Sequence, residues 1–172
     1  MYYNIRLAEK KDLATLPGIE KKASALFKET KYFLAVGKDV TTFEDFEEAQ
    51  EDGHLFVAIN ENDKPIGFAY MEIMGHGVHL DELDVLPEYG GKGIGTALVK
   101  KVNSWAKEKS YSAVSLTTYK NISWNAPFYK KLGFKEVVVS EMPKQLYTLF
   151  LQEHEQGLLM EDRVVMIFEV EK

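Results

Sequence analysis

The chain has 172 residues, of which 45% are hydrophobic and 28% are charged, a size and composition typical of one globular domain. It contains no cysteine, which excludes disulfide scaffolds, thiolate metal sites and a cysteine nucleophile. A net charge of −6 disfavours nucleic acid as a partner and favours cationic ligands such as amines. We expect a single domain over residues 1–172.

The N-terminal third alternates short strand and helix patterns. Apolar and polar residues alternate over residues 3–8, which predicts a strand. Helical spacing predicts a short helix over 12–16 and a longer one from Pro17 to about Phe27. Thr42 is a typical N-cap residue and predicts a third helix with acids in its first turns.

From residue 54 the hydrophobic period changes to two, and strands and helices then alternate. The predicted strands cover 55–59, 65–74, 78–86, 113–118, 135–140 and 163–170. The predicted helices cover 94–109, 123–132 and 144–156. This order predicts an α/β fold with a mixed sheet of about seven strands and helices on both faces.

A glycine-rich segment joins the strand at 78–86 to the helix at 94–109. Glycines stand at positions 90, 91, 93 and 95. Free N–H groups at a helix start attract anions, and glycine lets the main chain approach a phosphate closely. The segment therefore predicts a phosphate or pyrophosphate site; the alternative is a turn whose small residues serve packing.

Two common phosphate motifs do not fit this segment. A Walker loop would need glycine at Leu86 and Ser or Thr at Gly93. A dinucleotide fingerprint would need its last glycine at Thr96 or Leu98. Both motifs are excluded.

The segment instead resembles the GNAT superfamily of acetyl-CoA-dependent N-acetyltransferases. The family loop reads Gln/Arg-x-x-Gly-x-Gly/Ala; residues 93–95 match its second half, whereas Gly90 replaces the Arg or Gln. The stretch Asn125 to Phe134 is similar to the family's second signature, and the resemblance covers nearly the whole chain in element order. It implies a GNAT-like fold splayed between the fourth and fifth strands, one N-acetyltransferase domain, and acetyl-CoA as co-substrate.

The resemblance also implies roles for individual residues. Asn125 helps to bind the pantetheine arm, and Tyr129 protonates the leaving thiolate. A bulge around Leu83 to Val85 frees an N–H that polarises the thioester carbonyl. Lys92 neutralises a phosphate or is simply solvated. The implied CoA contacts are Leu83, Val85, Gly90, Gly91, Lys92, Gly93, Ile94, Gly95, Thr96, Asn125 and Tyr129.

The group that removes the amine proton is expected on the strand at 78–86. Regular alternation puts His79, Asp81 and Leu83 on one face, and Glu82 and Asp84 on the other. His79 stands where some family members carry a basic carboxylate, and its ordinary pKa suits the task. Glu82 is the second candidate. The alternative is that His79 only lines a pocket and water carries the proton.

The expected function is direct transfer of an acetyl group from acetyl-CoA to a primary amine in a ternary complex. The alternative is a non-catalytic acyl-CoA sensor or interaction module. The acidic run at 44–52 is a solvated face or, beside the acceptor, favours a cationic amine. His76 and His79 lack a third ligand, so no metal is expected. We expect a cytoplasmic protein without a membrane partner, and a homodimer would agree with the family.

Overall fold

The computed structural model describes residues 2–36, 40–75 and 77–171. The elements are β1 (Asn4–Leu7), η1 (Lys10–Thr15), α1 (Leu16–Ala23), η2 (Ser24–Phe27), α2 (Phe33–Val36), α3 (Phe43–Glu51), β2 (Leu55–Ile59), β3 (Pro65–Met74), β4 (Gly77–Val85), η3 (Pro87–Tyr89), α4 (Ile94–Glu108), β5 (Ala113–Tyr119), α5 (Ala126–Lys131), β6 (Lys135–Val137), η4 (Val139–Glu141), α6 (Lys144–Glu155) and β7 (Arg163–Glu169), where η marks a 3-10 helix. Within the described ranges, no helix has the length and apolar character needed to cross a membrane.

The seven strands form a mixed sheet in the order β1-β2-β3-β4-β5-β7-β6. β4 and β5 run parallel, whereas β1 with β2, β2 with β3, and β7 with both β5 and β6 run antiparallel. The prediction of a seven-stranded mixed sheet is confirmed. The chain folds as two compact units, the first of residues 1–72 and 80–102, the second of 73–79 and 103–172.

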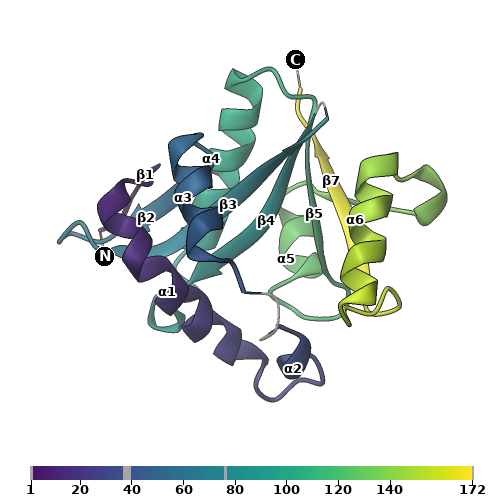
Figure 1. The fold of residues 1–172 in the computed structure, drawn as a ribbon, viewed down its shortest axis with the longest axis horizontal. Helices are drawn as coiled ribbons and strands as arrows, with labels where there is room; N and C mark the ends of the chain where they lie inside the picture. Colours follow the sequence, from purple (N-terminus) through teal and green to yellow (C-terminus); the bar gives the residue numbers. More distant parts are fainter. Residues whose placement is uncertain (1, 37–39, 76, 172) are drawn as a thin grey trace. The chain divides into compact units, whose positions relative to one another are not determined.

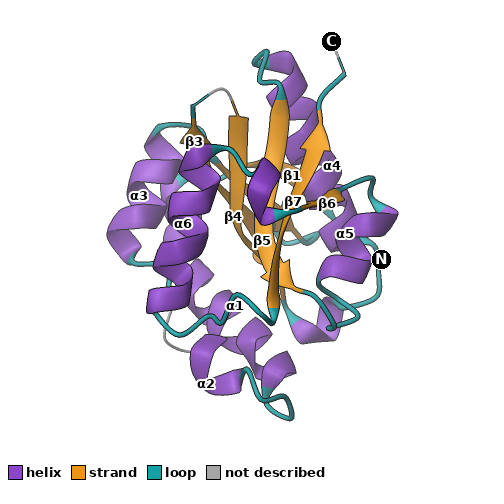
Figure 2. Cartoon of the chain, turned by 90° about the vertical axis from the view of Figure 1, so that its right-hand side faces the viewer, coloured by secondary structure: helices purple, strands orange, loops and turns teal. Residues whose placement is uncertain are grey.

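In the first unit, α1 and α3 cover one face of the strands and α4 covers the other (Figures 1 and 2). The rings of Phe46 on α3 and Phe68 on β3 meet edge to face with centroids 5.3 Å apart. Each apolar side chain buried in this way contributes about 1.5–3 kcal/mol. The core on the α1 and α3 face includes Leu13, Leu16, Ile19, Phe46, Ala49, Leu55, Val57, Phe68 and Tyr70.

In the second unit, α6 and α5 lie on opposite faces of β5 and β7 (Figure 2). Leu146 and Phe150 of α6 pack with Val165 of β7. On the other face, the ring of Phe134 lies 5.5 Å from that of Phe168. Val165 and Phe168 are an odd number of positions apart, so the period of two that predicted this strand also assigns its residues to the two faces.

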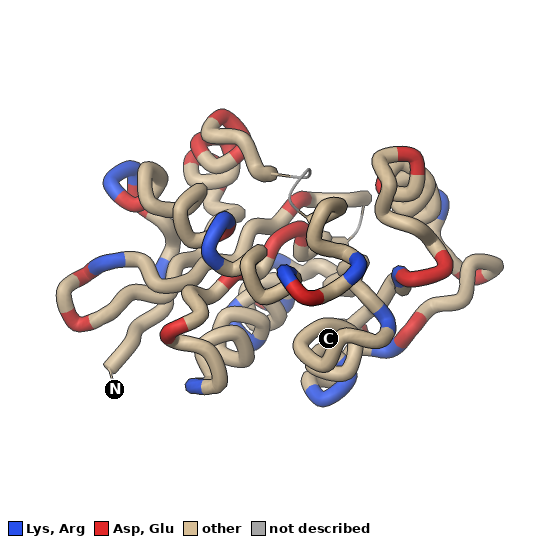
Figure 3. The backbone as a smooth tube through the Cα atoms, turned by 90° about the horizontal axis from the view of Figure 1, so that it is seen from below, with Lys and Arg blue, Asp and Glu red and all other residues tan. Residues whose placement is uncertain are grey.

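The α3 helix begins directly after Thr42, the residue predicted to be its N-cap. Its hydroxyl accepts a hydrogen bond from the Asp45 N–H at 3.1 Å, and the Asp45 carboxylate accepts one from the Thr42 N–H at 3.0 Å. The acids of this helix and its C-cap are exposed: Glu44, Glu47, Glu48, Glu51 and Asp52. Along the chain, acidic and basic positions are interspersed (Figure 3).

Three elements differ from the expectation. The helix predicted to reach Phe27 is α-helical only to Ala23, and η2 follows it. The strand predicted over 135–140 ends at Val137, where its pairing with β7 stops. The short helix α2 was not predicted; its four residues are too few to show a period.

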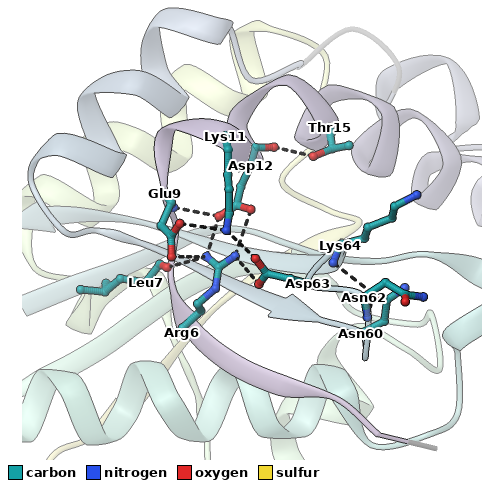
Figure 4. A network of polar contacts seen from close by, with 10 residues as sticks. All are labelled: Arg6, Leu7, Glu9, Lys11, Asp12, Thr15, Asn60, Asn62, Asp63 and Lys64. Atoms are coloured by element: carbon teal, nitrogen blue, oxygen red, sulfur yellow. Dashed lines mark hydrogen bonds and ion pairs between the residues drawn. The ribbon is translucent and has the colours of Figure 1, made fainter.

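A polar network in the first unit joins β1 to η1 and to the turn after β2 (Figure 4). Arg6 donates to both carboxylate oxygens of Asp12, at 2.6 and 3.1 Å, and to Asp63 at 3.0 Å. Asp12 is 1% exposed and also accepts the Glu9 N–H at 2.8 Å. Lys11 completes the network by an ion pair with Asp63.

The second unit contains a buried polar contact where β4 and β5 pair. Their parallel pairing joins residues 77–79 to 113–115. At its end, His79 Nδ1 lies 3.0 Å from Ser115 Oγ. His79 is 1% exposed, and burial, with a smaller effect of Arg163, lowers its pKa to about 4. The imidazole is therefore neutral at neutral pH.

Replacing Arg6 with alanine should lower the free energy of unfolding by about 3 kcal/mol, because the buried Asp12 carboxylate loses its cation. Urea unfolding measures this loss. Lys11→Ala is the control, since Lys11 is an exposed partner of Asp63 and its removal should change stability little. A loss no larger than that of the control would contradict the assignment.

His79 should make stability depend on pH. Between the ordinary pKa of 6.5 and about 4, the unfolded chain binds a proton that the native imidazole does not. Stability is therefore complete above pH 6.5 and is lost as the pH falls, by up to about 3 kcal/mol. We expect the free energy of unfolding, measured with denaturant between pH 7 and pH 4, to change less with pH for His79→Gln than for the wild type. An equal change in both proteins would contradict this prediction.

Candidate active site

The candidate phosphate loop lies in the first unit, between the end of β4 and the start of α4. Gly91 and Gly93 have φ angles of 70° and 81°, in the left-handed region. A Cβ at either position would meet no atom within 4 Å. These positions therefore require glycine for the backbone conformation and not for lack of space.

The main chain of this loop offers hydrogen-bond donors at the start of α4. The first helical N–H to close a bond is that of Ala97, which donates to the Gly93 carbonyl at 3.0 Å. The N–H groups of Ile94, Gly95 and Thr96 have no carbonyl one turn earlier within the helix. Together with the helix dipole they can hold an anion, and the preceding residues 90–93 are exposed.

Lys92 folds back onto the loop. Its Nζ donates to the Glu88 carbonyl at 2.8 Å and lies 5.2 Å from the centroid of the Tyr89 ring. An open hollow of about 510 Å³ beside the loop is lined in part by Glu61, Glu88 and Lys92. The two acids in this wall disfavour a phosphate there, so the helix start is the better anion site.

Asp81 of β4 acts electrostatically on Tyr70 of the neighbouring strand β3. The Tyr70 ring packs against Phe46 of α3 with centroids 6.4 Å apart. Burial raises the pKa of the Tyr70 hydroxyl, and nearby carboxylates, Asp81 among them, add to this effect. Asp81 itself is exposed.

Asp84 lies three positions further along β4. Burial and Glu20 of α1 act on its carboxyl group, and Leu86 packs against the core beneath α1. In a regular strand, residues three apart point in opposite directions, whereas a bulge between them puts both on one face. The bulge expected around Leu83 to Val85 stays a prediction.

Backbone approach near the end of β4 is close. A Cβ on Gly67 of β3 would lie 2.7 Å from the Asp84 carbonyl oxygen, so only glycine fits there. The Leu86 N–H donates to the Ile66 carbonyl at 2.9 Å, which places Phe68 across from Asp84. The flanking residues Leu83 and Val85 are partly exposed.

The two residues expected to remove a proton have different environments. His79 belongs to the second unit, where it is buried against Ser115. Glu82 belongs to the first unit, is partly exposed and directly precedes the expected bulge. His76 lies outside the described residues. Among the residues that are described, no group of three or more His, Asp or Glu side chains could hold a metal.

Asn125 and Tyr129 lie at the start of α5 in the second unit. Asn125 Nδ2 donates to Thr118 Oγ1 at 2.8 Å. Its Oδ1 is buried and has no hydrogen-bond partner in the described part of the chain, which leaves an acceptor for a ligand N–H. Tyr129 is 9% exposed and packs edge-on against Phe128 and Phe134. Pro127 in the first turn explains why α5 begins at Ala126 and not at residue 123.

Sequence reasoning missed two buried polar clusters. One is the pair of carboxyl groups of Asp84 and Glu20. The other joins Arg163 Nη2 to Glu153 Oε2 at 3.1 Å and to Thr117 Oγ1 at 2.9 Å. Each cluster joins residues from separate elements, and no spacing in the sequence could have signalled them.

Comparison with known proteins gives consistent results. A model of the acetyltransferase (GNAT) family matches residues 22–134. Peptidyl-lysine N-acetyltransferase YjaB of Escherichia coli is 39% identical over 90 residues, 51% of this chain and 54% of that protein. Thialysine N-epsilon-acetyltransferase of Mus musculus is 36% identical over 77 residues, 43% of this chain and 44% of that one. The chain thus matches about half the length of these curated relatives.

The fold is also that of a solved acetyltransferase. The crystal structure of PaiA N-acetyltransferase from Thermoplasma acidophilum in complex with coenzyme A has a TM-score of 0.72 and 20% identity to this chain. The superposition covers 98% of this chain and 99% of that one. The family model spans more than half of the chain and includes both the glycine loop and α5. The chain belongs to the GNAT acetyltransferase family.

Proposed function

We propose that residues 1–172 form one acetyltransferase domain that moves an acetyl group from acetyl-CoA to a primary amine. The observation that carries this proposal is the loop at the start of α4, where Gly91 and Gly93 have left-handed conformations and the first-turn N–H groups that follow have no carbonyl one turn earlier within the helix. Three elements, β3, β4 and α4, each begin in one unit and end in the other, which supports a single domain.

The loop holds the pyrophosphate of CoA. Main-chain N–H groups from Gly91 to Thr96 donate to the phosphate oxygens, so the missing Arg or Gln at Gly90 costs one side-chain contact only. The Lys92 ammonium adds positive charge beside the loop. The main chain of Leu83 and Val85, next to the bulge, pairs with the pantetheine and polarises the thioester carbonyl.

Two residues of α5 act on the other end of the cofactor. The unpaired Oδ1 of Asn125 accepts an N–H of the pantetheine arm. Tyr129 donates its proton to the thiolate when the C–S bond breaks. The transfer is direct, in a ternary complex; a cysteine acyl-enzyme is excluded because the sequence contains no cysteine.

The acceptor is an amine of lysine type. The two curated relatives are named for peptidyl-lysine and for thialysine, and the net charge of −6 attracts a cation. On the resemblance alone, His79 and Glu82 are the candidates for proton removal. Burial and a pKa near 4 make His79 a neutral group that holds Ser115, which favours Glu82 of these two.

Gly93→Asp and Gly95→Asp should each weaken CoA binding by about tenfold or more, since a carboxylate then opposes the phosphates. Isothermal titration with CoA measures the affinity. Gly53→Asp is the matched control, because Gly53 also has a left-handed φ of 73° but lies in the turn after α3. Unchanged affinity in folded loop variants would refute the loop assignment.

Tyr129→Phe should lower kcat about 100-fold and leave CoA affinity unchanged, because only the proton for the thiolate is lost. The assay is amine-dependent release of CoA thiol from acetyl-CoA with n-butylamine, L-lysine and Nα-acetyl-L-lysine methylamide as acceptors. CoA binding without release by the wild type would instead favour an acyl-CoA sensor. A variant with full kcat would remove Tyr129 from the mechanism.

A further inference from the structure

The environment of the Asp84 side chain is unusual for a residue that only supports the fold. Part of Asp84 reaches the surface, but its Oδ2 atom is buried and has no hydrogen-bond partner in the described ranges. A buried carboxyl oxygen without a donor costs stability, typically 1–3 kcal/mol. Unsatisfied buried polar groups of this kind concentrate at functional sites.

The surroundings of Asp84 raise its affinity for a proton. Phe68 lies across from it on β3, and Leu86 packs beside it in the core. The charged group that faces it from a neighbouring element is Glu20 of α1. Burial and the negative charge of Glu20 raise the pKa of the Asp84 carboxyl well above its ordinary value.

Glu20 is itself held in position. It is 7% exposed, and its Oε1 accepts the Thr41 N–H at 3.0 Å. One carboxyl oxygen of Glu20 is therefore held in place on α1, from where the group raises the pKa of the Asp84 carboxyl.

Asp84 also occupies a special position along the chain. It lies between Leu83 and Val85, whose main chain the proposed function assigns to the thioester. Consecutive Cα atoms are about 3.8 Å apart, so the Asp84 carboxyl is within side-chain reach of that main chain. The expected bulge turns this side chain to the face of α1.

We propose that Asp84 is the group that takes the proton from the acceptor amine, with Glu20 as the residue that tunes it. This inference rests on the proposed function and deepens it. It replaces His79 and Glu82 in that role, because the His79 ring is held against Ser115, and because Asp84 carries the buried carboxyl oxygen that has no donor in the described ranges. An acid with a raised pKa is a stronger base near neutral pH than an exposed carboxylate.

The reaction balances with these groups. The acceptor ammonium gives one proton to the Asp84 carboxylate and becomes a neutral amine. Its lone pair attacks the thioester carbonyl carbon, the C–N bond forms, and the C–S bond breaks. The thiolate takes the Tyr129 proton, and the remaining excess proton on nitrogen returns to Tyr129 through water. The proton on Asp84 passes to solvent, so one proton is released per acetyl group transferred.

The test compares Asp84→Asn, Glu20→Gln and Glu82→Gln, with Glu47→Gln on the exposed face of α3 as the charge-matched control. The acceptor is Nα-acetyl-L-lysine methylamide, and kcat/KM is measured from pH 5 to 10 at saturating acetyl-CoA. We expect Asp84→Asn to lose about 100-fold or more of kcat/KM with CoA affinity retained. Glu20→Gln should move the acidic limb of the kcat/KM pH profile to lower pH, because removal of the carboxyl group of Glu20 lowers the pKa of Asp84.

A second measurement does not depend on turnover. Because the native Asp84 carboxyl binds a proton that the unfolded chain releases, its presence lowers stability as the pH rises above about 4. Asp84→Asn should therefore have a higher Tm than the wild type at pH 8, and the difference should be smaller at pH 5. This gain in stability with a loss of activity distinguishes a base from a residue that only supports the fold.

The outcomes separate the two proposals. No amine-dependent CoA release by the wild type overturns the proposed function and this inference with it. Release by the wild type together with full activity of Asp84→Asn overturns the inference alone. A loss of kcat/KM confined to Glu82→Gln also overturns the inference alone and identifies Glu82 as the group that takes the amine proton. If the acidic limb of the kcat/KM profile of Glu20→Gln lies at the same pH as that of the wild type, Glu20 does not set the pKa of Asp84.

Discussion

The close approach of β3 to the end of β4 is the constraint on which the rest of the first unit depends. A Cβ on Gly67 of β3 would lie 2.7 Å from the Asp84 carbonyl oxygen, so glycine is required where the two strands meet. The bulge expected around Leu83 to Val85 falls at this point, just before the strand enters the glycine loop and α4. The end of β4 and the start of α4 are therefore consecutive parts of one strand-loop-helix segment.

Buried polar atoms that cost stability occur on several elements in the described ranges, Gln50 of α3 and Asn103 of α4 among them. The core beneath α1 and α3 is apolar, with Phe46, Phe68 and Leu55 fully buried. By contrast, the buried Asp84 oxygen and the Oδ1 of Asn125 have no partners in the described ranges. A fold optimised for stability alone would replace them with apolar or satisfied groups. Their retention agrees with roles toward ligands, which is the basis of both proposals.

Local patterns predicted most elements well. Thr42 is the N-cap that the sequence suggested, and in the structure it forms a capping box with Asp45. Errors arose where pairing partners decide the outcome. The strand after Gly133 ends at Val137, where its pairing with β7 stops although β7 continues to Arg163, and the next residues Val138 and Val139 are exposed. No local property of these valines distinguishes them from strand residues.

For the candidate site, the sequence alone predicted the glycine loop and the helix that follows it, because these depend on short-range backbone chemistry. Asn125 and Tyr129 were named from the resemblance of residues 125–134 to the family's second signature. Only the tertiary structure decided which acids are buried and which way they face. A single extra residue in a strand reverses its alternation, and the pKa of a carboxyl group depends on elements far away in the chain. Glu20 and Asp84 are 64 positions apart and influence each other only because α1 packs on β4.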